Sequence, residues 1–250
     1  MEEMLVHGRR PDSVPTYAQE LLDLLRIAVV AGVCVGILVI GLGSRLAMLL
    51  LRVTSPDDVI GVTSDDGFEI GRTTLSGTYN LLALGAGVGV IGALACIAVA
   101  PWLIGPGWFR RLTVGMTAGA LVGSMVIVPG GIDFTRLEPT WLAVALFVGL
   151  PVVAGILLTL AVDRVAAPGS WTRRDHVALL LPVGLLAVVP LTLLVLLPVA
   201  LVVAVLLPVR RLLLTPLLAS RVGTLGVRGV FFVIPVLSFF ALGQDLAELY

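Results

Sequence analysis

The feature that most constrains this sequence is a series of uncharged, continuously apolar runs, each close to the length that crosses a bilayer. A transmembrane helix needs about 20 mostly apolar residues to cross a hydrocarbon core of about 30 Å. The runs that meet or approach this length are Ile27–Gly43, Leu81–Ile104, Leu112–Pro129, Trp141–Val162, Val177–Leu207 and Gly229–Leu242. Charged residues make up only 13% of the chain, and they gather in short clusters between these runs. The pattern is typical of a chain that passes through a membrane several times.

The continuity of these runs indicates helices and not the strands of a barrel. In lipid every backbone N–H and C=O group has to be satisfied within the protein, so only α-helices and closed β-barrels span a membrane. Barrel strands alternate between apolar and polar residues, whereas these runs do not. We therefore predict an all-α fold, a polytopic transmembrane helical bundle with about six or seven membrane segments. Residues 1–250 form a single integral membrane domain in this interpretation.

The polar stretches predict short segments outside the membrane. Residues 1–25 are expected to form a cytoplasmic tail and an interfacial helix that begins near Tyr17 and runs into the first span. Residues 54–77 are expected to form an extracytoplasmic loop. Within this loop Asp66-Gly67 suits the two-residue turn of a small β-hairpin over residues 59–72. The acidity of the loop leaves open a solvated cap or a divalent-cation site, although the spacing is not that of an EF-hand.

The longest apolar run, Val177–Leu207, does not fit one crossing. As a single helix its 31 residues would be about 46 Å long, which exceeds the hydrocarbon core. Pro182, Pro190 and Pro198 interrupt the run, and interior prolines kink or break helices. We predict a Pro-broken hairpin that turns near Pro190 and returns to its starting side. One long span and a re-entrant hairpin are the alternatives.

Arginine placement predicts the orientation of the chain. Basic clusters alternate along the sequence with the acidic loops 54–77 and 132–139; they are Arg9/Arg10/Arg26, Arg110/Arg111 and Arg164/Arg173/Arg174. The positive-inside rule places these clusters in the cytoplasm. The N-terminus is then cytoplasmic and the C-terminus extracytoplasmic. Arg45 and Arg52 count against this orientation, because they fall at the outer end of the first span; Arg45 either snorkels to the headgroups or pairs with a carboxylate inside the bundle.

Glycines in the first three runs predict close helix packing. Small residues one helical turn apart let helix backbones approach each other in lipid. The glycines with such spacing are Gly32 and Gly36 in the first run, Gly85, Gly87, Gly89 and Gly92 in the second, and Gly115, Gly119 and Gly123 in the third. We expect these spans to pack on one another within the chain, with a homodimer contact as the alternative.

The sequence contains no recognisable catalytic constellation, so we assign no catalytic, cofactor-binding or metal-binding residues and expect no enzyme. His7 and His176 lie outside the spans and far apart in the sequence. Cys34 and Cys96 fall inside apolar runs without metal-ligand spacing, and we expect both to be free thiols. The formal net charge is zero, so no nucleic-acid partner is expected. The expected surroundings are the lipid bilayer, with a protein partner or a second copy as possible neighbours.

By elimination the leading functional hypothesis is a non-catalytic multi-pass protein that serves as a structural or accessory subunit of a membrane assembly. The predicted hairpin offers a docking surface for such a partner. The alternative is a transporter or carrier for a hydrophobic or small neutral substrate, with Ser124, Thr159 and Thr192 as candidate polar lining. Ionisable residues in the middle of a span, which usually mark a transport pathway, are missing from the sequence.

Several stretches resemble uncharacterised multi-pass membrane proteins of high-GC Gram-positive bacteria. They are Gly41-Leu-Gly-Ser-Arg-Leu-Ala-Met, Thr54-Ser-Pro-Asp, Asp65-Asp-Gly-Phe-Glu-Ile-Gly, Gly77-Thr-Tyr-Asn-Leu and Trp141-Leu-Ala-Val-Ala-Leu-Phe. The resemblance covers roughly the first two-thirds of the chain. It implies a bacterial plasma-membrane location and no particular activity.

Overall fold

The computed structural model describes residues 17–63, 74–173 and 221–249, and every regular element in these ranges is a helix. Four helices are long and apolar enough to cross a membrane: Gln19–Thr54, Leu75–Trp102, Thr140–Ala166 and Phe232–Leu249. The predicted all-α membrane fold is confirmed at this level, and the protein has a membrane location. The finer prediction of six or seven segments is not confirmed.

The first membrane helix is continuous although it has three parts. They are α1 (Tyr17–Val35), the π-helix η1 (Gly36–Gly41) and α2 (Leu42–Thr54). The prediction that the helix begins near Tyr17 and runs into the first span is therefore confirmed, and the helix continues past Gly43 to Thr54. The π-helix was not predicted; a π turn widens the helix by one residue and places Gly41, five residues after Gly36, back on the side that faces a neighbouring helix.

The other elements follow the predicted apolar runs with shifted ends. They are η2 (Asp57–Val59), α3 (Leu75–Val99), η3 (Ala100–Trp102), α4 (Gly107–Val126), α5 (Ile132–Thr135), α6 (Thr140–Ala166), η4 (Trp171–Arg173) and α10 (Arg221–Leu249). The N-terminus of α3 is capped by Thr74, whose side-chain oxygen accepts a hydrogen bond from the Gly77 backbone N–H at 3.1 Å. Although α4 is not among the four apolar spans, it runs within the bundle.

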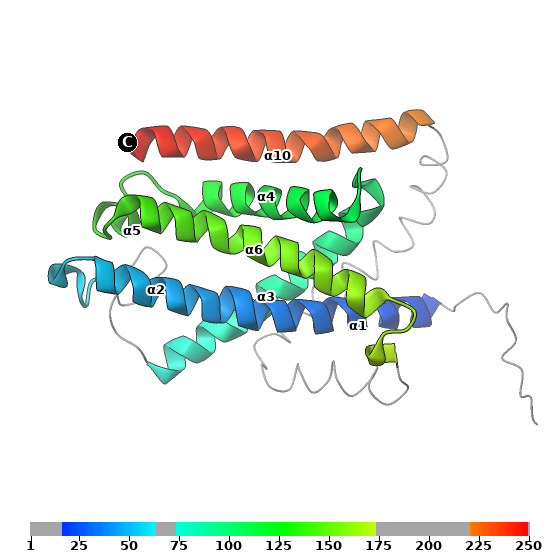
Figure 1. Cartoon of the computed structure of the whole chain (residues 1–250), viewed down its shortest axis with the longest axis horizontal. Coiled ribbons are helices and arrows are strands. Elements are labelled where there is room, and N and C mark those ends of the chain that lie inside the picture. Colours follow the sequence, from blue (N-terminus) through cyan, green and yellow to red (C-terminus); the bar gives the residue numbers. More distant parts are fainter. Residues whose placement is uncertain (1–16, 64–73, 174–220, 250) are drawn as a thin grey trace, which may run out of the picture.

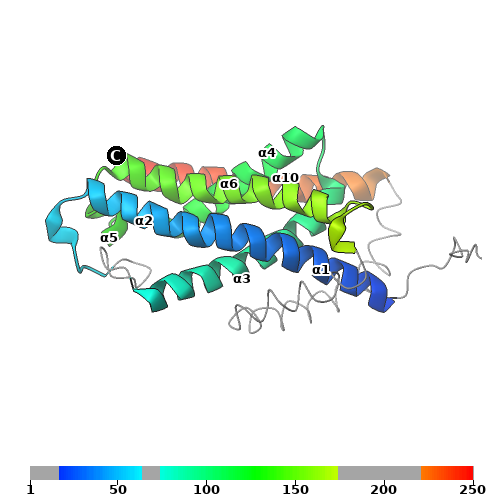
Figure 2. The same cartoon turned by 60° about the horizontal axis from the view of Figure 1, so that its bottom comes forward.

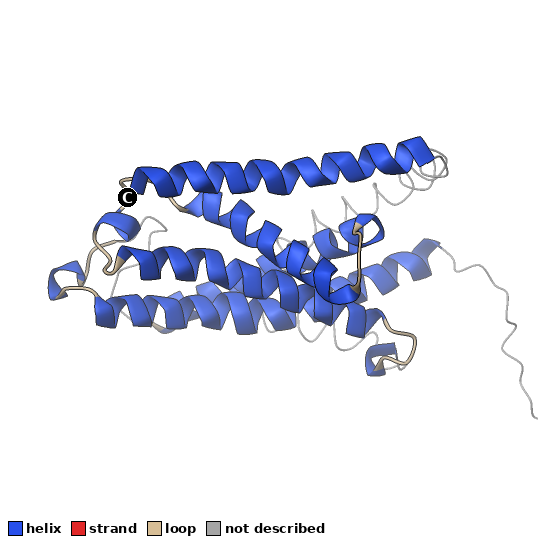
Figure 3. Cartoon of the chain, turned by 45° about the horizontal axis from the view of Figure 1, so that its top comes forward, coloured by secondary structure: helices blue, strands red, loops and turns tan. Residues whose placement is uncertain are grey.

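The helices lie side by side along one direction, with α4 between α6 and α10 (Figure 1). Turned views show α3 crossing beneath α1 and α2 (Figure 2) and α10 along the opposite side of the bundle (Figure 3). The bundle has two ends. The Arg26 end carries the start of α1, the end of α6 and the start of α10, and the Arg45 end carries the end of α2, α5 and the end of α10.

The closest helix packing joins the first helix to α3 through glycine. A Cβ atom added to Gly32 would lie 2.5 Å from the Val90 Cα atom, and one added to Gly85 would lie 2.7 Å from the Gly41 backbone nitrogen. A Cβ on Gly89 would run into the carbonyl oxygen of Gly32. The two backbones are therefore in direct contact, which confirms the predicted packing of glycine-bearing spans within the chain.

The same mode of packing joins α4 to α6. A Cβ atom on Gly115 would lie 2.7 Å from the Val152 carbonyl oxygen, and one on Gly119 would lie 3.0 Å from the Val148 carbonyl oxygen. On the α6 side, a Cβ atom on Gly155 would lie 2.9 Å from the Gly115 Cα atom. The third glycine-bearing segment therefore packs on α6, a pairing that the glycine spacing alone did not specify.

Two predicted features lie largely outside the described residues. The β-hairpin over residues 59–72 is described only at its start, where Val59 ends the 3₁₀ turn η2, and no strand is assigned within the described ranges. The run Val177–Leu207, with the predicted break near Pro190, falls entirely outside them. Both stay predictions.

Candidate functional site

Within the described ranges, the side chains that could carry chemistry are dispersed. Among these residues no group of three or more His, Cys, Asp and Glu side chains could hold a metal ion. Cys34 and Cys96 are free thiols, as predicted; Cys34 is exposed and Cys96 is buried. The Cys96 Sγ atom lies 3.8 Å from the Thr159 hydroxyl oxygen.

The hydroxyl groups predicted to line a transport path are not brought together. Thr159 donates a hydrogen bond to the Gly155 carbonyl oxygen at 2.8 Å, within its own helix. Ser124, which is half-buried on α4, donates to the Leu121 carbonyl oxygen at 3.0 Å. Thr192 lies outside the described residues. Ser124 and Thr159 each satisfy their hydroxyl group locally, as is usual for hydroxyl side chains in membrane helices.

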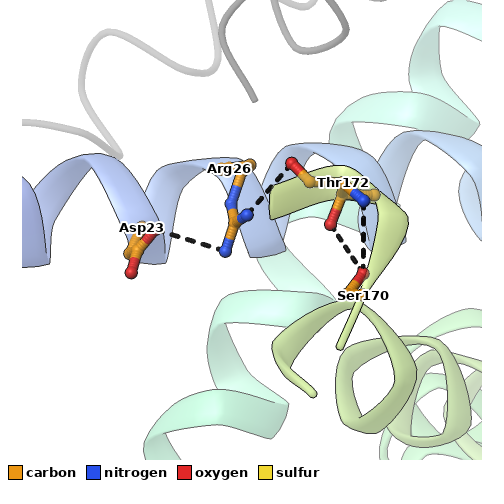
Figure 4. A network of polar contacts seen from close by, with 4 residues as sticks. All are labelled: Asp23, Arg26, Ser170 and Thr172. Atoms are coloured by element: carbon orange, nitrogen blue, oxygen red, sulfur yellow. Dashed lines mark hydrogen bonds and ion pairs between the residues drawn. The ribbon is translucent and has the colours of Figure 1, made fainter. Parts of the chain in front are cut away.

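A buried arginine fixes the segment after α6 against α1 (Figure 4). The Arg26 side chain is only 4% exposed, and its Nη1 donates a hydrogen bond to the Thr172 carbonyl oxygen at 3.1 Å. Its Nη2 lies 3.2 Å from the Asp23 carboxylate, one turn earlier on the same helix. Thr172 is fully buried, and its hydroxyl lies 2.8 Å from that of Ser170. The contact joins residues that are 146 positions apart in the sequence.

Sequence reasoning placed Arg26 at the membrane interface and did not predict its burial. The sequence feature that could have indicated this burial is the position of Arg26, directly before the uncharged run that begins at Ile27. A guanidinium at such a boundary either reaches water or finds a carbonyl partner, because an unpaired buried charge is costly. Its partner here is a main-chain carbonyl after α6, and a main-chain acceptor leaves no mark in the sequence.

A second arginine joins two helices at the opposite end of the bundle. The Arg45 Nη2 atom donates hydrogen bonds to the Thr78 hydroxyl at 3.0 Å and to the Thr74 carbonyl oxygen at 3.4 Å. Thr74 is also the N-cap of α3, so the arginine binds where that helix begins. In the part of the chain that the structure describes, Arg45 therefore bonds to threonines, and the carboxylate pairing that was one of the two alternatives for Arg45 is not found.

Other polar contacts tie neighbouring segments at the two ends. At the Arg26 end, Arg111 Nη2 of α4 lies 3.1 Å from the Asp163 carboxylate of α6, and both side chains are partly exposed. At the Arg45 end, the Ser55 hydroxyl accepts a hydrogen bond from the Glu138 backbone N–H at 2.9 Å, which joins the end of α2 to the start of α6. These contacts hold helices together and do not converge on one point.

Between these two ends lies an apolar groove of about 410 Å³ between the first helix and α6. One wall includes Leu38, Val39 and Gly43, and the other includes Ala145 and Gly149. No polar side chain lines it. The groove is open, since Leu38 and Val153 on its walls are exposed, and its lining suits only an apolar occupant.

Comparison of the chain with models of protein families, with curated proteins and with solved structures found no match. The resemblance to membrane proteins of high-GC Gram-positive bacteria therefore stays a prediction. Function is therefore inferred from the fold itself: from the apolar groove, from the contacts of Arg26 and Arg45, and from the apolar side chains that the bundle leaves exposed.

Proposed function

We propose that the protein is a multi-pass plasma-membrane protein that serves as a non-catalytic structural or accessory subunit of a membrane assembly. The observation that carries this proposal is the helix α10. Only 11% of its apolar segment Phe232–Leu249 is buried inside the protein. Ser238 and Leu242 are its buried residues among those described, whereas Phe232, Val236 and Phe240 are exposed.

The contacts of α10 leave a broad apolar face open to a partner or to lipid. Along the bundle α10 packs mainly on α4, and Leu242 lies against Gly123 of that helix. A helix is usually held by a broad apolar face packed against its neighbours, yet most of this one faces away from its own chain. Exposed apolar surface of this extent is typical of contact with lipid or with a membrane partner.

The positions of arginine support a plasma-membrane topology with the N-terminus in the cytoplasm. The Arg26 end carries Arg26, Arg110, Arg111 and Arg164, in agreement with the positive-inside rule. In this topology five described helices cross the membrane, because α4 lies between α6 and α10 and has a length of about 30 Å. Because α10 ends at the Arg45 end, the C-terminus is extracytoplasmic in this proposed topology.

The proposal is tested by purification from native membranes in mild detergent, followed by mass spectrometry of the co-purifying molecules. We expect a protein partner in fixed stoichiometry. Replacing Phe232 and Phe240 by alanine on α10 should release the partner. The matched control replaces Leu84 and Ile91, which are exposed on α3, and should retain it. Purification of the chain without any protein partner would contradict the proposal.

A carrier for a hydrophobic or small neutral substrate is the second candidate, and one observation favours it. The apolar groove lies beside the π turn Gly36–Gly41 and beside the part of α6 that contains Pro151. Carriers commonly place binding sites at broken helices in the middle of the membrane. A lone protein that co-purifies with a small molecule in fixed stoichiometry would favour this candidate over the subunit.

A further inference from the structure

The π turn Gly36–Gly41 interrupts the first membrane helix near its middle. The Leu42 backbone N–H donates to the Ile37 carbonyl oxygen, five residues earlier, whereas an α-helix bonds four residues back. The turn therefore holds one residue more than α-helical geometry needs. Single π turns of this kind are rare, and they are frequent at functional sites.

Glycine contacts hold the π turn against α3. A Cβ atom on Gly36 would run into the Gly85 carbonyl oxygen, and one on Gly85 would lie 2.7 Å from the Gly41 backbone nitrogen. A Cβ atom on Gly41 would lie 3.0 Å from the Leu82 Cα atom. In an unbroken α-helix, residues five positions apart point about 140° away from each other. The π turn is thus what allows Gly36 and Gly41 to face α3 together.

The two halves of the first helix differ in how tightly they are packed. From residue 26 to residue 35, every residue except Cys34 is buried. Beyond the turn, Leu51 is the one buried residue in the described stretch 42–53, and Leu46 is 67% exposed. The half before the turn is therefore fixed in the bundle, whereas α2 can rotate with little loss of apolar burial. The π turn lies at the boundary between the two halves.

The sequence offers α2 a second register. If the turn adopts α-helical bonding while α1 stays in place, α2 rotates by about 100° and advances by about 1.5 Å. Each residue of α2 then takes the place of the residue that follows it. Leu50 replaces Leu51 at the buried position, and Ser44 replaces Arg45 opposite the Thr78 hydroxyl. Both exchanges keep the character of the position, the first apolar and the second hydrogen-bonding.

A third exchange makes the two registers different in shape. Ile40 would take the place of Gly41, where even a Cβ atom lies 2.9 Å from the Leu82 Cδ2 atom and 3.0 Å from its Cα atom. An isoleucine side chain does not fit there, so the α register requires α2 to move away from α3. Arg45 leaves the Thr78 hydroxyl in the same step.

We propose that the π turn is a register switch that moves the half of the first helix at the Arg45 end between two arrangements. In the π register, which the structure shows, α2 lies against α3 through Gly41 and Arg45. In the α register, α2 is turned and parted from the start of α3. Contacts with α3 stabilise the first arrangement, and regular α-helical hydrogen bonding stabilises the second. A partner or ligand that binds one arrangement better shifts the population toward it.

The experiment measures distances between pairs of spin labels on the full-length protein in vesicles of phosphatidylethanolamine and phosphatidylglycerol, with both native cysteines replaced by alanine. Leu46→Cys and Leu75→Cys carry the first pair, because both leucines are exposed and they lie on α2 and α3. We expect two populations of distance, because a rotation of about 100° displaces a side chain by about 8 Å on a helix of this width. Leu22→Cys with Ala95→Cys is the control pair on α1 and α3, and it should give one population.

Two changes within the turn should move the populations in opposite directions. Deletion of Val39 removes the surplus residue, so an unbroken α-helix still places Gly41 against α3, and only the population of the π register should remain. Gly41→Leu puts a side chain against Leu82 in the π register alone, so only the other population should remain. If the leucine variant does not fold, Gly41→Ala gives the same test with a smaller side chain.

A deletion in the tightly packed half is the control for the deletion of Val39. Deletion of Ala31, which is buried on α1, rotates one side of a packed helix against the other and should lower the melting temperature. Deletion of Val39 should not lower it, because the helix on each side of the turn keeps its neighbours.

The proposal is overturned by a single distance in the unaltered protein that Gly41→Leu and Gly41→Ala leave unchanged, because the π turn would then be fixed. It is also overturned if deletion of Val39 lowers the melting temperature as much as deletion of Ala31, because the turn would then hold no surplus residue. Both results leave the subunit and carrier hypotheses as they are, since co-purification tests those separately.

Discussion

Arg26 and Arg45 lie 19 residues apart on one continuous helix, and each donates hydrogen bonds to another segment at opposite ends of the bundle. At 1.5 Å per residue the helix between them is about 28 Å long, close to the hydrocarbon thickness of about 30 Å. The intervening stretch contains no charged residue. The two arginines therefore delimit the part of this helix that suits the lipid core, and each fixes one end of it to the bundle.

The buried contact of Arg26 predicts a substantial loss of stability on its removal. Arg26→Ala deletes the hydrogen bond to the Thr172 carbonyl oxygen, and bonds made by charged groups contribute about 1.5–3 kcal/mol. We expect the free energy of unfolding to fall by that amount, measured by reversible unfolding in mixed micelles. The control is Arg164→Ala, at an exposed position on α6, where a change within about 0.5 kcal/mol is expected. Equal effects of the two substitutions would contradict a stabilising role for the Arg26 contact.

Replacing a glycine by alanine should lower stability where the glycine lies in a helix–helix contact and should not lower it where the glycine faces open space. Gly89→Ala places a methyl group against the Gly32 carbonyl oxygen, and forced overpacking costs about 1–3 kcal/mol. Gly149→Ala meets nothing within 4 Å and should stabilise the helix by up to about 1 kcal/mol, because alanine favours helix over glycine. Thermal unfolding in detergent measures both. A Gly89→Ala protein as stable as the unaltered one would show that the two backbones are farther apart.

The helices could be predicted from the sequence because an apolar run depends only on residues that are neighbours in the chain. Continuous apolar runs predict where α3 and α6 lie, Asp163 and Arg164 mark the end of the α6 run, and the four-residue glycine spacing predicted close packing of Gly32 and Gly36. The extent of α10 was predicted less well: it begins at Arg221, whereas the apolar run begins at Gly229, because helical hydrogen bonding continues beyond the apolar stretch.

The groove and the Arg26 contact could not be predicted, because both depend on which helices are neighbours. Gly43 and Gly149 form a recess only because the first helix lies against α6, and no local pattern specifies that pair. The Arg26 contact joins positions 146 residues apart, and its acceptor is a main-chain oxygen. The π turn between Gly36 and Gly41 likewise follows from contact with α3 and has no sequence signature of its own.

The ion pair between Arg111 and Asp163 should contribute little, in contrast to Arg26. The Arg111 and Asp163 side chains are 34% and 51% exposed, and exposed pairs are worth about 0–1 kcal/mol because water and salt screen them. We expect Asp163→Asn to lower the unfolding free energy by less than about 1 kcal/mol, with a smaller difference at high salt. A double-mutant cycle with Arg111→Gln isolates the pair. A coupling as large as the effect of Arg26→Ala would contradict this ranking.

The proposed topology predicts which positions a membrane-impermeant thiol reagent reaches in intact cells. Single cysteines are introduced after Cys34 and Cys96 have been replaced by alanine. Asp58→Cys, at an exposed position of the Arg45 end, should be labelled in intact cells. Pro106→Cys, exposed between α3 and α4, should be labelled only after lysis, because the Arg26 end carries the basic clusters. The reverse pattern would show that the orientation is inverted.

The same labelling tests the predicted hairpin near Pro190. The end of α6 and the start of α10 lie at the same end of the bundle, as the predicted hairpin requires. Arg210→Cys should therefore be labelled only after lysis, like Pro106→Cys. Strong labelling of position 210 in intact cells, with Pro106→Cys still protected, would exclude the hairpin.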